Sequence, residues 1–353
     1  MHSHTRLGIT GLCFLAITLA LLLAANALAQ KRVNWKMQSA FGSTLDVVGE
    51  SGPKFSENLR TMSNGTLELK FYEPGALVPA LEIFNAVSVG SIDAGWTTPG
   101  YHAGRIPSAS FFTGVPFGPA AGEYLAWLKF GGGHELKDEI YARHGVRGIS
   151  CTLIPPEASG WFRKEIKTVS DLEGIKMRFF GMGAKVMQKL GVSTQLLAPG
   201  DIYPALERGV IDATELSFPS IDYNLGFYQV AKHYYFPGWH NQSAIGELLV
   251  NLEKFDALSE DHRRMIEVAC DANMTWTYAV SEARQFVAMR KLVENHGVTI
   301  HFWSDEILAK MRESWQDVVE EESARDPDFR RVYDSYADFR ERYAIWLEHG
   351  YLK

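Results

Sequence analysis

The chain lacks the sequence motifs that would assign it to a common class of enzyme. It contains no Gly-x-Ser-x-Gly nucleophile elbow, no His-Glu-x-x-His zinc motif, no phosphate-binding loop and no dinucleotide fingerprint. It also lacks runs of lysine or arginine, and the formal net charge of its 353 residues is −7. These absences lower the expectation of catalysis and argue against nucleic acid or an anionic membrane surface as a partner.

Cysteine is scarce. Cys13 falls within an apolar N-terminal segment, which leaves Cys151 and Cys270 in the body of the chain. Two cysteines do not form a disulfide framework of the kind found in small secreted domains. They can pair in an oxidising compartment, but two isolated buried thiols are equally compatible with the sequence. Both alternatives stay open at this point.

One long apolar run is present, and it lies at the N-terminus. Arg6 supplies a positive start, residues 12–25 are apolar, and Ala27-Leu28-Ala29 is a small-x-small cleavage site. The pattern predicts a signal peptide over residues 1–29, cleaved after Ala29. We therefore expect a protein exported to the periplasm.

Strands and helices alternate in two separate runs, which predicts an α/β fold of two similar lobes. Alternation of apolar and polar residues marks a strand at 66–72, and Ser43 or Thr44 can cap a helix that ends near Gly65. The segment 259–295 has no glycine or proline and predicts one long helix. The expected division is a first part of lobe 1 at 30–154, lobe 2 at 155–245, a return to lobe 1 with the long helix at 246–300, and C-terminal helices at 301–353.

An arginine lies inside an apolar strand. Arg178 follows Met177 and precedes two phenylalanines in the predicted strand 175–180. A guanidinium there is costly unless it is paired and hydrogen-bonded. Two interpretations remain: an internal ion pair with a nearby acid, or a clamp that holds a ligand carboxylate by two parallel hydrogen bonds.

Two acids belong with this arginine. Glu215 ends another predicted strand and Glu157 lies just past the end of a third, so all three meet at one edge of the lobe if the strands are parallel. They form either a salt-bridge triad or a site for a metal ion or an ammonium group, with an anion on Arg178. His233 and His240 flank an aromatic segment and are interpreted as hydrogen-bonded wall residues.

A second group of candidates follows the strand at 92–96. Thr97, Thr98 and Tyr101 come directly after it. Ligands of open α/β sheets lie beyond the carboxyl ends of strands, which makes these side chains candidate ligand contacts. The alternative is an ordinary solvated turn, which position along the chain does not exclude.

Over nearly its whole mature length the sequence resembles a known family. It is similar to the DctP-type solute-binding proteins of TRAP (tripartite ATP-independent periplasmic) transporters, and within them to the branch that binds 2-oxo acids. The segments that carry the resemblance are GALVPAL at 75–81, VPFG at 115–118, GWFRKE at 160–165, IKMR at 175–178, PGDIYPALE at 199–207, GVIDA at 209–213, LGFY at 225–228 and YYFPGW at 234–239.

The resemblance implies two lobes, braced by the long helix, that close over a small solute and deliver it to a membrane permease without catalysis. Arg178 matches the family's carboxylate clamp, and Glu215 matches an acidic ligand of a bridging ion, Ca²⁺ or Na⁺. Leu216 stands where a backbone carbonyl binds that ion. Glu157 replaces a glutamine of the branch and Asn241 replaces an acid, so the acids still number two. Phe180 and Trp239 complete the expected solute contacts.

The charges leave two ligand classes open. The formal charges of Glu157, Glu215 and Arg178 add up to −2 + 1 = −1. A dication bound together with a monocarboxylate would bring the charge of the site to zero, and so would a single protonated amine. Arg178 favours the acid, a 2-oxo or 2-hydroxy acid, over an amine or amino alcohol held without metal. A different class of function is a secreted enzyme that uses the two acids as an acid–base pair.

The C-terminal helices admit two arrangements. They can exchange between two copies of the chain, as in some relatives, to form a homodimer, or pack across the hinge of their own chain.

Overall fold

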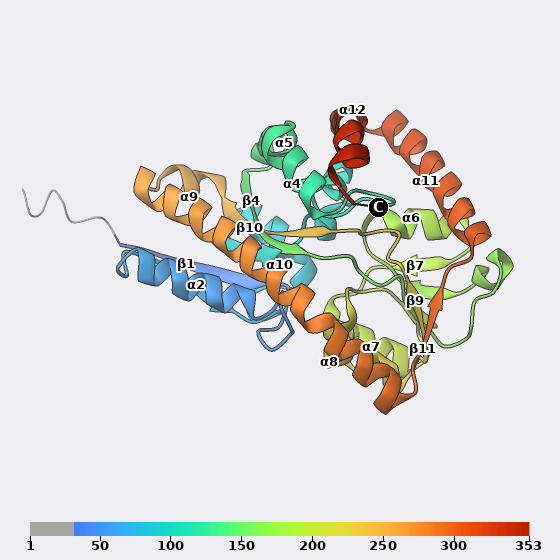
Figure 1. Ribbon diagram of the computed structural model, residues 1–353. Coiled ribbons are helices and arrows are strands. Elements are labelled where there is room, and N and C mark those ends of the chain that lie inside the picture. The colour runs from blue at the N-terminus through green and yellow to red at the C-terminus, as the bar shows by residue number, and fades with distance from the viewer. Residues whose placement is uncertain (1–31, 353) are drawn as a thin grey trace, which may run out of the picture.

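The computed structural model describes residues 32–352, and Figure 1 shows their arrangement. The signal peptide predicted at 1–29 lies outside the described residues. Within 32–352, none of the helices combines the length and apolar character that crossing a membrane requires.

Lobe 1 is built on sheet A, whose strand order is β2-β1-β3-β10-β4. Its strands are β1 (Val33–Ser39), β2 (Leu67–Tyr72), β3 (Ala94–Thr97), β4 (Val146–Ile154) and β10 (Ala244–Asn251). The first three run parallel, and β10 is antiparallel to both of its neighbours. The helices of this lobe are α2 (Ser51–Met62), α3 (Ile83–Ser88), α4 (Ala121–Phe130), α5 (Gly133–Ala142) and α9 (Leu252–Asp256), with the short 3₁₀ turns η1 (Ala80–Glu82), η2 (Pro99–His102) and η3 (Pro107–Phe112).

Lobe 2 is built on sheet B, with the order β11-β9-β5-β8-β6-β7. Its strands are β5 (Gly160–Phe162), β6 (Lys176–Arg178), β7 (Ser193–Gln195), β8 (Ala213–Thr214), β9 (His233–Phe236) and β11 (Thr299–Phe302). β6 is parallel to β7 and β8, whereas β5 is antiparallel to β8 and β9. The helices are α6 (Gly181–Lys189), α7 (Pro199–Glu207) and α8 (Pro219–Leu225), with η4 (Val169–Leu172) and η5 (Phe227–Gln229).

Both sheets present the same kind of edge to the space between them. In sheet A the carboxyl ends of β1, β3 and β4 meet the start of the antiparallel β10. In sheet B the carboxyl ends of β6, β8 and β9 meet the start of the antiparallel β5. Because β10 and β5 run opposite to their neighbours, these two strands begin at the edge where the neighbouring strands end. The segments that follow or precede these strands therefore converge at the boundary of the lobes.

One long helix joins the lobes. α10 (Glu260–His296) packs against β4 and α2 of lobe 1 and against α8 of lobe 2, and Figure 1 shows it running diagonally across both. The hydroxyl of Ser259 accepts a hydrogen bond from the His262 backbone at its start. Gly297, at φ 63°, ends the helix in a conformation that disfavours other residues. The prediction of one long helix at 259–295 is confirmed.

The two cysteines pair. Cys151 of β4 and Cys270 of α10 form a disulfide across a sequence separation of 119 residues. The bond ties the long helix to sheet A, and of the two alternatives that the sequence left open, the structure has the pair. The amide of Asn273, also on α10, donates to the Cys151 carbonyl over 2.7 Å and reinforces the same contact.

The first helix begins later than predicted. Neither Ser43 nor Thr44 caps a helix, because residues 42–50 form a series of turns and α2 starts at Ser51. Ser43 is held instead by Glu73, whose carboxylate accepts from its backbone N–H over 3.0 Å. Val47 has a positive φ of 57°, which no helical turn accommodates. The prediction was wrong because these contacts come from distant parts of the chain.

The C-terminal helices pack on both lobes of their own chain. α11 (Asp305–Arg325) lies against α6 of lobe 2, and α12 (Pro327–Gly350) lies against α4, α5 and η3 of lobe 1. Phe329 of α12 packs 4.7 Å from Phe111, centroid to centroid, and Tyr336 packs 5.3 Å from Trp127. Together with α10, this hairpin is a second connection between the lobes.

Candidate functional site

A cavity of about 60 Å³ lies where the converging strand ends of the two lobes meet. Lobe 1 contributes Phe41, Leu45 and Val48 after β1, Thr98 and Tyr101 after β3, Thr113 after η3, Thr152 and Ile154 of β4, and Ala244, Ile245 and Gly246 of β10. Glu157, Arg178, Phe180, Pro199, Leu216, Ser217, Ile221 and Asn241 complete the lining. A water molecule needs about 10–15 Å³ of such space, so the cavity holds a ligand only a few atoms across.

Arg178, at the end of β6, is buried and paired with a buried acid. Its Nη1 donates to Glu215 Oε2 over 2.9 Å and also to the Glu215 backbone carbonyl. The backbone N–H of Phe180 donates to the same carboxylate oxygen over 3.1 Å. The internal ion pair that the sequence left as one interpretation is therefore present. Arg178 also lines the cavity, so the pair does not remove it from reach of a ligand.

Glu157 lies just past the end of β4, as the sequence indicated, but β4 belongs to sheet A and not to the sheet that carries Arg178 and Glu215. Glu157 also precedes the antiparallel β5 of sheet B, and the start of β5 lies at the same edge as the ends of β6 and β8. Its backbone N–H donates to the Asn241 carbonyl over 3.1 Å, and the Asn241 side-chain amide donates to its Oε2 over 2.7 Å. At Gly238 an added Cβ would overlap the Glu157 carbonyl, so glycine permits this close approach.

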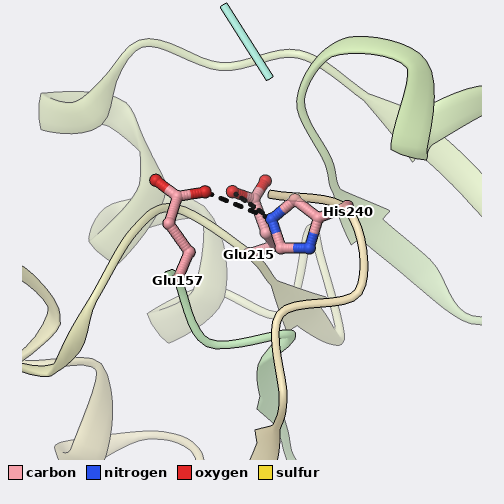
Figure 2. A group of neighbouring side chains, drawn as sticks. All are labelled: Glu157, Glu215 and His240. Atoms are coloured by element: carbon pink, nitrogen blue, oxygen red, sulfur yellow. Dashed lines mark ion pairs between the residues drawn. The ribbon is translucent and has the colours of Figure 1, made fainter. Parts of the chain in front are cut away.

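A histidine sits between the two acids. His240 Nε2 lies 3.3 Å from Glu157 Oε2 and 3.3 Å from Glu215 Oε1, as Figure 2 shows. All three side chains are buried. Sequence reasoning treated His240 as a wall residue, and the available signal was its place directly before Asn241, a predicted ligand. The carboxyl end of β9 brings it to the edge where Glu215 and Glu157 lie.

The acids and bases of the site perturb one another. Burial raises the pKa of Glu157, and the neighbouring Glu215 adds to the effect. Burial alone would also raise the pKa of Glu215, but Arg178, His240 and the Phe180 N–H together outweigh the effect of burial and lower that pKa. Burial alone would lower the pKa of His240, because it disfavours the charged imidazole. The two carboxylates together outweigh the effect of burial and raise this pKa to about 9. With His240 protonated the site is neutral, since two acids and two cations sum to −2 + 2 = 0.

The donor set of these residues fits a cation. Carboxylate oxygens of Glu157 and Glu215 and a ring nitrogen of His240 all lie within 4.8 Å of one another. Glu215 Oε1 and both ring nitrogens of His240 are buried and make no well-aligned hydrogen bond among the described residues, although Nε2 lies 3.3 Å from each acid. A buried oxygen without a partner calls for a proton donor or a metal ion. Of the four predicted metal ligands, Glu157, Leu216 and Asn241 line the cavity, whereas Glu215 does not.

Most of the predicted solute contacts gather around this cavity. The Tyr101 ring meets Phe180 edge-on with centroids 5.5 Å apart, which places lobe 1 against lobe 2 beside Arg178. Burial raises the pKa of Tyr101 to about 12, so its hydroxyl keeps its proton. Thr98 Oγ1 lies 2.6 Å from Thr113 Oγ1 and donates to the Ile245 carbonyl over 3.2 Å.

Two predicted contacts lie elsewhere. Thr97 does not line the cavity, because it is the last residue of β3 and pairs with Glu247 inside sheet A. Trp239 does not line it either. Its ring packs in the core, 5.7 Å from Phe117 and 5.9 Å from Phe179, centroid to centroid. In both cases the side chain beside the cavity belongs to a neighbour in sequence, Thr98 or Asn241.

The comparison with known families decides the kinship of the chain. Residues 39–326 match the family model described as bacterial extracellular solute-binding protein, family 7, also called DctP. This chain belongs to that family. The predicted resemblance to TRAP solute-binding proteins and the two-lobed α/β fold are confirmed. The members of family 7 are periplasmic receptors that bind small solutes for delivery to a membrane permease, rather than enzymes.

Individual relatives of this family 7 protein carry named ligands. A monocarboxylate 2-oxoacid-binding periplasmic protein of Nostoc sp. is 34% identical over 316 residues, which covers 89% of this chain and 86% of the relative. A TRAP solute-binding protein from Bordetella bronchiseptica, with calcium and picolinate, is 33% identical with a TM-score of 0.88, covering 90% of this chain and 94% of the other.

A second solved relative is more distant in sequence but nearly as close in fold. A protein from Pseudoalteromonas atlantica, with bound sodium and pyruvate, is 30% identical with a TM-score of 0.86. The match covers 90% of this chain and 96% of that one.

Proposed function

We propose that this solute-binding protein captures a small monocarboxylate, a 2-oxo or 2-hydroxy acid, and delivers it to the membrane permease of a TRAP transporter. In this proposal a cation, Ca²⁺ or Na⁺, bridges the solute to Glu157 and Glu215. The observation that carries the proposal is the meeting of Arg178, the cavity and a buried acid pair at one edge of lobe 2. The solutes of the Nostoc and Pseudoalteromonas relatives support the same ligand class.

Each residue has a distinct task in this proposal. Arg178 binds the solute carboxylate, and its pairing with Glu215 holds the guanidinium in place beside the cavity. Glu157 and Glu215 hold the cation, and Leu216 and Asn241, which line the cavity together with Glu157, supply further oxygen donors. The bound cation supplies positive charge to a carboxylate and a 2-oxo oxygen. Tyr101 and Thr98 close the cavity from lobe 1 and exclude water from the solute.

The charge count agrees with a bridged monocarboxylate. When a dication takes the place of the proton on His240, the formal charges of the two acids and Arg178 add up to −2 + 1 = −1. The dication and one solute carboxylate then bring the net charge of the site to −1 + 2 − 1 = 0. An amine held by the two acids without metal remains the alternative ligand. The acid–base pair of a secreted enzyme is the alternative of another class.

We infer further that residues 1–29 act as an export signal cleaved after Ala29, so that the mature chain works in the periplasm. The contacts of α11 and α12 with both lobes fit a monomer, and the same contacts between two copies fit a homodimer formed by helix exchange. The N-terminal residue of the exported protein tests the first statement, and its mass in solution tests the second.

Calorimetric titration tests the ligand. Chelator-treated protein in a sodium-free buffer should bind pyruvate weakly, and addition of Ca²⁺ or Na⁺ should tighten that binding at least tenfold. Glu215→Gln should need a much higher cation concentration to reach the same tightening, whereas Glu207→Gln, on the exposed face of α7, should respond as the wild type does. Binding of 2-amino-1-propanol with no binding of any acid would establish the amine instead. Turnover of a bound solute would establish the enzyme.

A further inference from the structure

Two histidines meet at the outer edge of sheet B, outside the solute cavity. Nδ1 of His233, on β9, lies 2.9 Å from Nε2 of His301, on β11. The two strands pair in parallel at the end of the sheet, with Tyr235 opposite His301 (Figure 1). Because side chains alternate along a strand, His233 and Tyr235 share one face of the sheet, and His301 lies on that same face. Neither histidine lines the cavity.

The separation of the two ring nitrogens suits a shared metal ion. An imidazole nitrogen binds a transition metal at about 2.0–2.1 Å. Two nitrogens bound to one ion at that distance and about 90° apart, as in square-planar or octahedral coordination, lie about 2.9 Å from each other. His233 and His301 already have this separation. A hydrogen bond between two imidazoles needs one proton between the nitrogens, and a cation that displaces this proton leaves both rings where they are.

A carboxylate lies behind one of the rings. Glu165 Oε1 is 3.8 Å from His301 Nδ1, the ring nitrogen that does not face His233. Metal-binding histidines usually direct their second N–H to a carboxylate, a carbonyl or water, which fixes the tautomer and raises the basicity of the ligating nitrogen. A proton on His301 Nδ1 leaves Nε2 free as a ligand. Lys167 Nζ lies 3.1 Å from the other oxygen of Glu165, so Oε1 stays on the side of the ring.

The histidine pair is held in place and is still reached by solvent. The His301 side chain is 15% exposed and the Glu165 side chain 41% exposed. The Tyr235 ring stacks on the His301 ring with centroids 4.7 Å apart and 13° between the planes, which fixes the imidazole. An ion that enters here keeps water as its remaining ligands. Nitrogen ligands suit Ni²⁺, Cu²⁺ and Zn²⁺, whereas Ca²⁺ prefers oxygen.

We propose that His233 and His301 bind one transition-metal ion of the Ni²⁺ and Cu²⁺ class, at a site separate from the solute cavity. β11 is the edge strand of sheet B and connects α10 to α11. An ion with one ligand on each strand fastens this connection to β9 of lobe 2. Cu²⁺ should bind more tightly than Ni²⁺ or Zn²⁺, as it does at nitrogen sites in general, and Ca²⁺ should not compete. The site lies outside the cavity, so it does not depend on which solute the protein carries.

Calorimetric titration with Ni²⁺ tests the proposal on the mature chain prepared without a histidine tag. The wild type should bind one equivalent at this site, and His301→Gln or His233→Gln should lose it. His240 is a second candidate nickel ligand, in the cavity, so His240→Gln is titrated as well and should retain the equivalent. His349→Gln is the matched control, because His349 is 70% exposed and lies far along the chain on α12, and it should bind as the wild type does.

Two further measurements distinguish a metal site from an ordinary hydrogen-bonded pair. Glu165→Gln should keep the equivalent but weaken Ni²⁺ binding by about tenfold or more, because it removes the acceptor behind His301. Saturating Ni²⁺ should raise the midpoint of thermal unfolding of the wild type and not that of His301→Gln, since an ion bound only by the folded state stabilises it.

Electron paramagnetic resonance of the Cu²⁺ complex needs no variant and decides the ligands directly. With less than one equivalent of Cu²⁺, the wild type should show coupling to two imidazole nitrogens. Coupling to a single nitrogen, or an equivalent of Ni²⁺ that His240→Gln loses and His301→Gln retains, would place the ion in the cavity and overturn the proposal. A folded wild type that takes up neither Ni²⁺ nor Cu²⁺ would show that the two histidines only hydrogen-bond to each other.

Discussion

Arg178 has two roles in the site, and a set of substitutions separates them. It neutralises Glu215 at 2.9 Å, with both side chains at 1% exposure or less, and it lines the cavity where we place the solute carboxylate. Arg178→Met alone removes the nearest cation from the buried Glu215 carboxylate and leaves His240 to neutralise two acids. Removing one partner of such a pair destabilises a fold by about 3–5 kcal/mol. A loss of binding in this variant would therefore not distinguish a clamp from a structural ion pair.

The Glu215→Gln background removes that ambiguity. Glutamine keeps an oxygen that can accept the Phe180 N–H, but it carries no charge that requires Arg178. Arg178→Met in this background should restore most of the free energy of unfolding lost in the single Arg178→Met variant. Binding of a monocarboxylate should nevertheless fall by about 2–5 kcal/mol, about thirtyfold or more, relative to Glu215→Gln alone.

Urea unfolding and calorimetry measure the two effects separately. Solute titrations are made at high Ca²⁺, so that the weaker cation site of Glu215→Gln is filled. If the double variant binds the acid as well as Glu215→Gln does, Arg178 serves only to neutralise Glu215, and the assignment of the carboxylate clamp is wrong. Arg163→Met, on the partly exposed Arg163 that donates to the Leu206 carbonyl, is the matched control and should leave solute binding unchanged.

Two further predictions concern closure of the lobes and pH. Gly100→Ala adds a Cβ that overlaps the Phe180 ring across the lobe boundary, so it should reduce the population of closed protein and weaken solute binding about tenfold or more. Gly104→Ala is the control, because the space around its Cβ is open, and it should leave binding unchanged. Equal affinities of the two variants would show that the contact between Gly100 and Phe180 is not required for closure. Burial raises the pKa of Asp222 to about 7, from about 3.9 in the unfolded chain, so its contribution to stability is present below about pH 4 and is lost as pH rises through about 7. Asp222→Asn should therefore flatten the decline in the free energy of unfolding that urea titrations measure between about pH 4 and 7. Part of the decline should remain, because burial also raises the pKa of Glu247 to about 7. An unchanged decline would mean that Asp222 is charged in the folded protein.

Local patterns in the sequence predicted the elements whose signals are local. The alternation at 66–72 corresponds to β2, and the stretch without glycine or proline corresponds to α10, with Gly297 directly after it. Binary patterning and helix stop signals act over a few residues, so they are readable without tertiary contacts. Arg178 was notable for the same reason, because a charge in an apolar strand is anomalous wherever the strand lies.

Errors arose where distant segments decide the local structure. The turns at 42–50 replace the first part of the predicted helix because Glu73 and Arg284, far away in sequence, hold the loop and Val47 takes a positive φ. Glu157 follows the end of a strand as predicted, but that strand, β4, belongs to lobe 1, and the antiparallel β5 that follows it joins Glu157 to sheet B. His240 was assigned to a wall because nothing in its own segment reveals the two acids beside it.

The amino-acid sequence by itself determined the α/β class, the long helix and the presence of a buried arginine near two acids. Each of these follows from composition and short-range periodicity. Only the tertiary structure decided which side chains share the cavity, that Cys151 pairs with Cys270, and that His240 lies between the acids. Those contacts join residues separated by many strands and helices, and strand direction at two sheet edges, which no local pattern encodes, brings them together.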